Sequence, residues 1–196
     1  MRRARYLSHP QVRIDPETPV PTWGLSDVGL RRIEALAAQG WLAGTALVVS
    51  SAERKAAETA RIIAKSLGLD VEVRQAMHEN DRSATGFLPP SEFEATADQF
   101  FARPHESVRG WERAIDAQVR IVREADAVLA RDFRGDVLFV GHGAVGTLLY
   151  CRYAGLSIDR RHDQPAGGGN YFTFEIAHRR AEHSWRPIEI APASRD

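Results

Sequence analysis

Short apolar runs that alternate with amphipathic helical segments are the feature that most constrains the fold of this chain. The runs at residues 5–8, 46–49, 71–73 and 136–140 have the length and composition of buried strands. Between the first two, apolar residues recur at helical spacing in a segment that Ser26 can cap and that ends near Gln39, before Gly40. Strands that alternate with helices favour a mainly parallel sheet covered on both faces, so we predict an α/β fold.

The remaining segments extend this pattern and add one interruption. We predict a helix that a capping box, Ser50 to Glu53, opens and that runs to about Leu67, a helix over about 111–133 and a helix from Gly143 to Ala154. Residues 163–170 form a Gly-rich loop, and 171–176 and 185–190 are the expected last strands. The stretch 75–109 is punctuated by proline and glycine, with a helix expected only over 91–101. We interpret it as a cap insertion in a single domain that spans residues 1–196.

Charge and composition exclude several classes of function. Lys plus Arg number 26 and Asp plus Glu number 26, so no global basic field is available to attract nucleic acid. No run approaches the roughly 20 apolar residues that cross a bilayer, so we expect no integral membrane protein. The single cysteine, Cys151, and the absence of a signal-like apolar start make a cytoplasmic location the expectation. A homodimer is left open.

Four reactive side chains follow the ends of successive predicted strands. His9, Glu79 and His142 follow the first, third and fourth strands, and Arg54 lies in the first turn of the helix after the second. Ligand sites of open α/β sheets lie outside the carboxyl ends of the strands, so these side chains are expected to converge there. Helix N-termini at the same edge favour phosphate, and a neutral histidine can attack phosphorus.

Each of these residues also has a purely structural interpretation. His9 could be an ordinary loop histidine, Arg54 could pair with Glu58 on a solvated helix face, and Glu79 lies in a polar cluster typical of exposed loops. His142 is harder to explain by packing, because it stands between two glycines directly after an apolar strand. Taken together, the four positions favour a site.

Two other chemistries were weighed. Gly141, Gly143 and Gly146 match the G-x-G-x-x-G pattern of dinucleotide-binding proteins, but no second βαβ unit with an acidic ribose ligand follows. A metal-dependent hydrolase could use His162 and Asp163 with His78 and Asp81, but their spacing fits no known ligand motif. We therefore expect neither a metal nor a cofactor.

Several motifs resemble those of the histidine phosphatase superfamily, also called phosphoglycerate mutase-like. Residues 5–10 are similar to its opening strand and Arg-His-Gly motif, residues 25–29 to the start of its first helix, and residues 50–60 to the segment that carries its pocket arginine. Glu79 stands in the place of its acid/base glutamate, residues 106–107 resemble the Glu-Ser that opens a later helix, and residues 140–143 resemble its second histidine motif.

The resemblance implies a three-layer α/β/α sandwich and a phosphatase that acts on a small phosphorylated substrate. His9 would accept the phosphoryl group, Arg54 and His142 would stabilise its oxygens, and Glu79 would protonate the leaving group and then activate water. Gly143 and Asn170 would line the pocket.

Two departures from the family pattern affect the expected activity. Ser8 stands where the family has an arginine and Pro10 where it has a glycine, so the pocket loses a guanidinium and a backbone donor. We therefore expect slow turnover, with Arg82 or Arg13 as a substitute cation. The alternatives are a catalytically degenerate protein that binds a phosphorylated ligand and a phosphoglycerate mutase-type phosphotransferase. The short, neutral insertion favours phosphatase over mutase.

Overall fold

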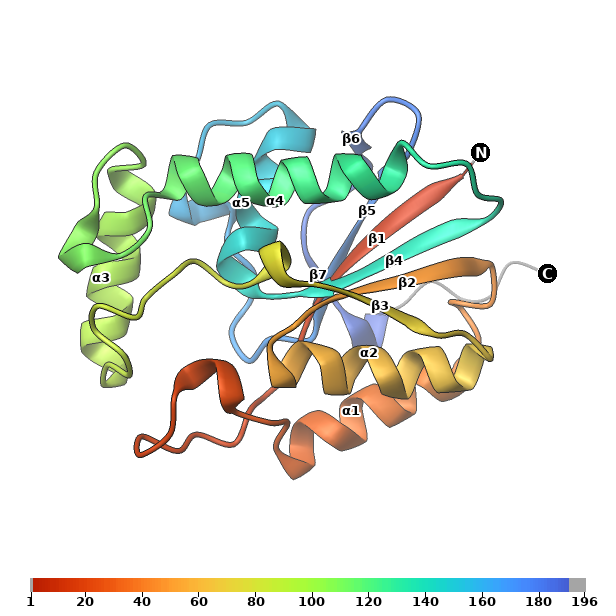
Figure 1. Ribbon diagram of the computed structural model, residues 1–196, viewed down its shortest axis with the longest axis horizontal. Coiled ribbons are helices and arrows are strands. Elements are labelled where there is room, and N and C mark those ends of the chain that lie inside the picture. Colours follow the sequence, from red (N-terminus) through yellow and green to blue (C-terminus); the bar gives the residue numbers. More distant parts are fainter. Residues whose placement is uncertain (1, 191–196) are drawn as a thin grey trace.

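The computed structural model describes residues 2–190, and within this range one mixed sheet carries the fold (Figure 1). Its seven strands lie in the order β3-β2-β4-β1-β5-β6, with β7 paired to β5. Their bounds are β1 (Arg3–Ser8), β2 (Thr45–Ser51), β3 (Val71–Arg74), β4 (Asp136–Gly141), β5 (Asn170–Glu175), β6 (Arg180–Ala181) and β7 (Arg186–Pro187).

The first four strands are parallel, and the register between two of them brings the candidate histidines level. β1 pairs with β4 so that Ser8 lies opposite Gly141. The next residue along each strand is His9 and His142 respectively, so the sheet delivers both to one edge. β5 then runs antiparallel to β1 on its other side.

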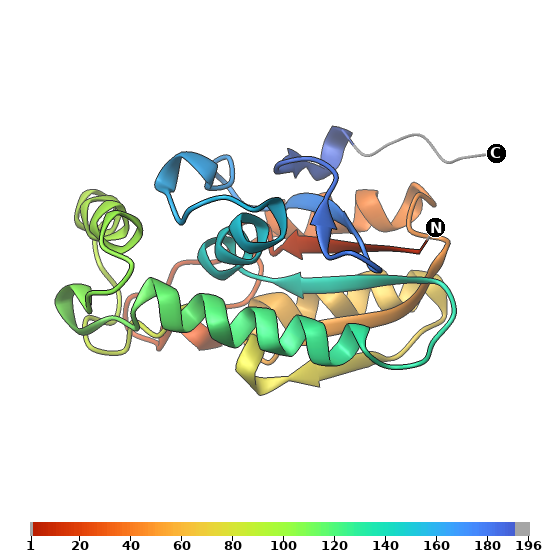
Figure 2. The same ribbon diagram turned by 90° about the horizontal axis from the view of Figure 1, so that it is seen from above.

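Helices cover both faces of the sheet, which gives three layers (Figure 1). One layer holds α1 (Asp27–Ala38) and α2 (Arg54–Leu67), and the other holds α4 (Ala114–Leu129) and α5 (Gly143–Ala154). α3 (Pro90–Ala102) stands apart, beyond the carboxyl ends of β1 and β4 (Figure 2). The predicted three-layer α/β fold is confirmed.

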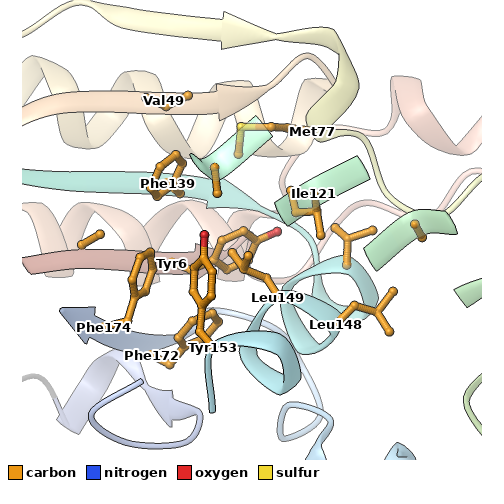
Figure 3. Packing of buried hydrophobic residues seen from close by; sticks show 14 of the residues in the cluster. Tyr6, Val49, Met77, Ile121, Phe139, Leu148, Leu149, Tyr153, Phe172 and Phe174 are labelled. Atoms are coloured by element: carbon orange, nitrogen blue, oxygen red, sulfur yellow. The ribbon is translucent and has the colours of Figure 1, made fainter. Parts of the chain in front are cut away.

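Aromatic side chains fill the core between the sheet and the α4–α5 layer. Tyr6 stacks on Phe172 with ring centroids 5.5 Å apart, and Phe139 and Phe174 continue this layer along the sheet (Figure 3). Removing such buried rings from water is the main favourable contribution to folding. The rigid core fixes the strand ends from which the site is built.

Several predicted boundaries were wrong. Ser50 and Glu53 form no capping box, because β2 continues through Ser51 in register with β3, and α2 begins only at Arg54. The predicted strand over 185–190 is reduced to Arg186–Pro187 and gives way to a 3-10 turn. The helix expected over 111–133 is α4, which is shorter at both ends. Ser26 does cap α1, accepting a hydrogen bond from the Gly29 amide at 3.2 Å.

Candidate active site

His9 and His142 lie face to edge at the carboxyl ends of adjacent strands. Their ring centroids are 5.3 Å apart and the rings are inclined at 70°. The His9 amide donates to the Gly141 carbonyl at 2.9 Å, which continues the β1–β4 ladder one residue beyond β1. The main chain therefore sets the separation of the two rings.

The His9 ring is neutral and its nucleophilic nitrogen is defined by a hydrogen bond. Its Nδ1 lies 2.8 Å from the Pro10 carbonyl oxygen. Because a carbonyl only accepts, Nδ1 carries the proton in the neutral ring and Nε2 keeps its lone pair. Burial, and then the nearby charge of Lys55, lower the pKa of His9 to about 4. The ring is thus available as a nucleophile at neutral pH.

His142 is completely buried and one of its nitrogens has no protein partner. Its Nε2 lies 2.8 Å from Ser51 Oγ, whereas Nδ1 makes no hydrogen bond to any residue in 2–190. Ser51 Oγ already accepts the Glu53 amide at 3.2 Å, so its hydroxyl hydrogen is free to go to Nε2. This network assigns the proton of the neutral ring to Nδ1. Burial holds the pKa of His142 well below its usual value.

Tyr6 braces the backbone of His142 from beneath. Its hydroxyl accepts the His142 amide at 3.0 Å and donates to the His142 carbonyl at 3.2 Å. A Cβ on Gly141 would lie 2.2 Å from the same hydroxyl, so this glycine is required for the brace. The second histidine is therefore held from both sides of the strand end.

Glu79 lies at the N-terminus of α5. Its Oε1 accepts from the Val145 amide at 3.0 Å and its Oε2 from the Ala144 amide at 3.3 Å. Burial raises the pKa of Glu79 even though these bonds and the charge of Arg82 oppose the rise. A carboxyl with a raised pKa is suited to exchange a proton with a bound ligand.

Arg54 does not enter the cavity that contains His9, contrary to the prediction. Its Nε pairs with Glu58 Oε1 at 2.7 Å, and its side chain is 64% exposed. It borders a neighbouring hollow of about 910 Å³ that does not include His9. The helical period explains the error, because position 54 shares a face with Glu58, Arg61 and Lys65, which point outward.

Lys55 takes the place that the prediction gave to Arg54. Its side chain is buried among cavity-lining residues, and its Nζ lies 2.5 Å from Glu53 Oε2 and 3.0 Å from the Val20 carbonyl. The sequence analysis missed Lys55, although the signal was present. Four residues on along the helix lies Thr59, which is buried, and helical spacing puts Lys55 on that same inner face.

Glu53 links the cation to the rest of the site and was also missed. Its Oε1 accepts the Glu79 amide at 2.8 Å and lies 3.6 Å from His142 Nε2. Burial alone would raise the pKa of this carboxyl, but His142 and Lys55 together lower it to about 2. The ion pair offsets much of the positive charge that Lys55 brings.

Arg82 lines the same cavity as His9, as predicted. Its guanidinium lies over the rings of Phe93 and Trp111, at 5.0 and 5.6 Å from their centroids. It makes no ion pair with a carboxylate anywhere in residues 2–190. Its charge contributes to the lowered pKa of His9. Arg13, the other proposed substitute, is exposed and lines a separate hollow.

Ser8 and Asn170 do not line the cavity, contrary to the prediction. Ser8 is completely buried, and its hydroxyl bonds Gln164 Oε1 at 2.5 Å and the Asn170 backbone. Asn170 directs its amide to Gln164 Oε1 and to the Pro165 carbonyl. Both side chains support the loop before β5. Gly143 does line the cavity.

These residues enclose a cavity of about 400 Å³ between the strand ends and α3. The strand-end side holds His9, Lys55, Glu79, Arg82, Gly143 and Gln164, and the α3 side is largely aromatic, with Phe93, Phe100, Phe101 and Trp111. Gln164 was not identified from the sequence. Among residues 2–190, no cluster of three or more His, Cys, Asp or Glu side chains is arranged to hold a metal ion. No described helix is both long and apolar enough to cross a membrane.

A family model decides the relationship. The model for the histidine phosphatase superfamily (branch 1) matches residues 11–185. The chain belongs to this superfamily. The protein is therefore a phosphatase that works through a histidine. The match begins just after His9, so the role of that residue rests on the geometry above.

Solved structures with the same fold are phosphatases by description. A mycobacterial glucosyl-3-phosphoglycerate phosphatase with inorganic phosphate superposes with a TM-score of 0.79 at 19% identity, covering 97% of this chain and 100% of the other. Bacillus stearothermophilus YhfR gives a TM-score of 0.79 at 18% identity, covering 100% and 98%. Entamoeba histolytica phosphoserine phosphatase in complex with 3-phosphoglyceric acid gives 0.75 at 15% identity, covering 95% and 97%. A search of curated protein sequences gave no match. At these identities the structures establish the shared fold alone.

Proposed function

We propose that the protein hydrolyses phosphomonoesters through a phosphohistidine on Nε2 of His9. The observation that carries this proposal is the pair of neutral, buried histidine rings 5.3 Å apart. One presents a lone pair and the other an unpartnered N–H, and both lie beside Lys55 and Arg82. This is the arrangement that a nucleophile and a donor to phosphoryl oxygens require.

In the first step, the Nε2 lone pair of His9 attacks phosphorus and the bond from phosphorus to the ester oxygen breaks. Glu79 in its protonated form donates its proton to that leaving oxygen, so the alcohol departs neutral. The raised pKa of Glu79 makes the protonated form accessible. The product of this step is phosphorylated His9 with Glu79 as a carboxylate.

In the second step, Glu79 takes a proton from water as the water oxygen attacks phosphorus. The bond from phosphorus to Nε2 breaks, inorganic phosphate leaves and His9 returns to its starting state. Lys55, Arg82 and the Nδ1–H of His142 are the donors available to the phosphoryl oxygens. No step needs a group that the chain does not supply.

Charge balance in the cavity predicts weak phosphate binding and slow turnover. Lys55 is paired with Glu53 at 2.5 Å, which leaves Arg82 as the cation without a carboxylate partner among the described residues. A doubly charged phosphoryl group is therefore under-compensated. The same observation favours the second candidate function, a protein that binds a phosphorylated ligand without turning it over.

The α3 side of the cavity favours a small substrate with an uncharged, apolar alcohol. Its lining is aromatic, and the cation there, Arg160, is occupied by Glu94 at 2.5 Å, Asp163 at 3.2 Å and Asp98 at 3.5 Å. A second anionic group on the substrate would meet no available partner on this side. We expect aryl phosphates to be better substrates than 3-phosphoglycerate.

A phosphatase assay with a generic aryl phosphate and a panel of phosphorylated metabolites tests the proposal. We expect metal-independent hydrolysis by the wild-type protein and none by His9→Ala, with phosphate binding measured in parallel by calorimetry. Phosphate binding without hydrolysis would establish the second candidate function. Activity that a chelator removes and a divalent metal restores would refute the mechanism.

The cellular setting remains a prediction. We infer a cytoplasmic protein without nucleic-acid partners from its balanced charge and its single cysteine. A homodimer stays open, and sedimentation velocity of the purified chain would decide it.

A further inference from the structure

We propose that the side-chain amide of Gln164 binds a phosphoryl oxygen in the cavity, an inference that rests on the proposed function. Gln164 lies in the loop between Asp163 and β5 and lines the cavity together with His9, Lys55 and Gly143. Its side chain is fixed in orientation by two residues that lie behind it, Ser8 and Asn170.

A chain of hydrogen bonds determines which end of the amide faces inward. The Pro165 carbonyl can only accept, so the Asn170 atom 3.0 Å from it is Nδ2. The same Nδ2 donates to the amide of Gln164 at 3.1 Å, so the Gln164 atom there is the oxygen, Oε1. The Ser8 hydroxyl donates to that oxygen as well, at 2.5 Å. Nε2 therefore lies at the free end.

The free end lies against the first residue of α5. A Cβ on Gly143 would be 2.2 Å from Gln164 Nε2, so this glycine allows the close approach. The two hydrogens of Nε2 find no acceptor among residues 2–190. A second orphaned group borders the same space, because His142 is completely buried and its Nδ1 has no partner. Two unpartnered nitrogens that can donate at one cavity point to an anionic oxygen as the missing partner.

The charge balance explains why a neutral donor suits this position. Lys55 is already paired with Glu53, and Glu79 adds negative charge at the N-terminus of α5. A further cation would form an ion pair with these carboxylates, whereas an amide held by Ser8 and Asn170 stays directed at the ligand. Preorganised neutral donors lose little when the ligand is absent and need no rearrangement when it binds.

The test compares Gln164→Met, which keeps the length of the side chain but removes both amide groups, with wild type. We expect the inhibition constant of inorganic phosphate against aryl phosphate hydrolysis to rise by about 3- to 10-fold, and kcat/KM to fall by a similar factor. Gln164→Glu should have a larger effect, because a carboxylate would repel the phosphate. Gln118→Met is the matched control, because Gln118 donates to the Leu148 carbonyl away from the cavity.

A double-mutant cycle with Ser8 separates phosphate binding from a structural role. Ser8→Ala should weaken phosphate inhibition by about 2- to 3-fold in the wild-type background and not at all in the Gln164→Met background, because its effect passes through the amide. An unchanged phosphate inhibition constant in Gln164→Met, in an enzyme that His9→Ala inactivates, would overturn this inference alone. A wild-type protein that neither binds phosphate nor hydrolyses esters would overturn the proposed function and this inference together.

Discussion

The protonation of His9 offers the sharpest test of the site. Its pKa of about 4 lies some 2.5 units below the usual 6.5, which corresponds to about 3.4 kcal/mol against the charged ring. Burial is the main cause and the Lys55 charge the next. A protonated ring has no lone pair for phosphorus, so kcat/KM should be flat from neutral pH downward and should fall only as pH approaches about 4.

Two measurements report this pKa independently. The first is the pH profile of kcat/KM for an aryl phosphate, and the second is a nuclear magnetic resonance titration of the His9 ring, assigned by comparison with His9→Ala. Lys55→Met removes a positive charge and should raise the pKa of His9, whereas the matched variant Arg54→Met should leave it unchanged. A His9 titration near 6.5 in the wild type, or an equal shift in both variants, would refute the electrostatic reasoning.

The same shift predicts a stability effect with a definite sign. Above pH 6.5 the ring is neutral in both folded and unfolded chains, so His9 contributes no pH dependence. Between pH 6.5 and about 4 the unfolded chain binds a proton that the folded chain refuses, so the free energy of unfolding falls as pH decreases. Over that window, His9→Asn should lose less stability than the wild type in urea unfolding.

Three further predictions concern the other side chains of the cavity. Lys55→Met should lower kcat/KM by about 100-fold or more, because it removes a buried cation from the phosphoryl site, whereas Arg54→Met should stay within about 3-fold; equal losses would contradict the reassignment. Arg82→Ala should lower kcat/KM or phosphate affinity by about 10- to 100-fold, since a charged hydrogen bond contributes about 1.5–3 kcal/mol, and wild-type kinetics would show that Arg82 does not contact the phosphate. Glu79→Gln should accumulate acid-labile phosphate on His9 with a good leaving group, because water activation is lost; the same label on a protein that lacks His9 would exclude it as the nucleophile.

Much of the site could be predicted because strand ends in a parallel sheet meet at one edge. His9, Glu79 and His142 needed only the positions of three apolar runs. The arginine was wrong by one residue. Adjacent positions on a helix differ by about 100°, so Arg54 faces solvent whereas Lys55 faces the cavity. Counting the buried period from Thr59 would have corrected the choice.

Ser8, Asn170 and Gln164 could not be placed from the sequence. Ser8 lies 156 residues from the Gln164 oxygen that it binds, and the contact exists because β5 runs antiparallel beside β1. No local pattern encodes such a pairing. The contact of Glu79 with the first turn of α5 depends in the same way on how the loop after β3 crosses the sheet edge.

The sequence by itself determined the alternation of strands and helices and the edge at which the histidines lie, because hydrophobic periodicity and strand ends are local properties of the chain. Tertiary structure decided the charge balance of the cavity, the proton positions on both rings and the direction of the Gln164 amide. These depend on burial and on hydrogen bonds between segments far apart in the chain, which only the folded sheet brings together.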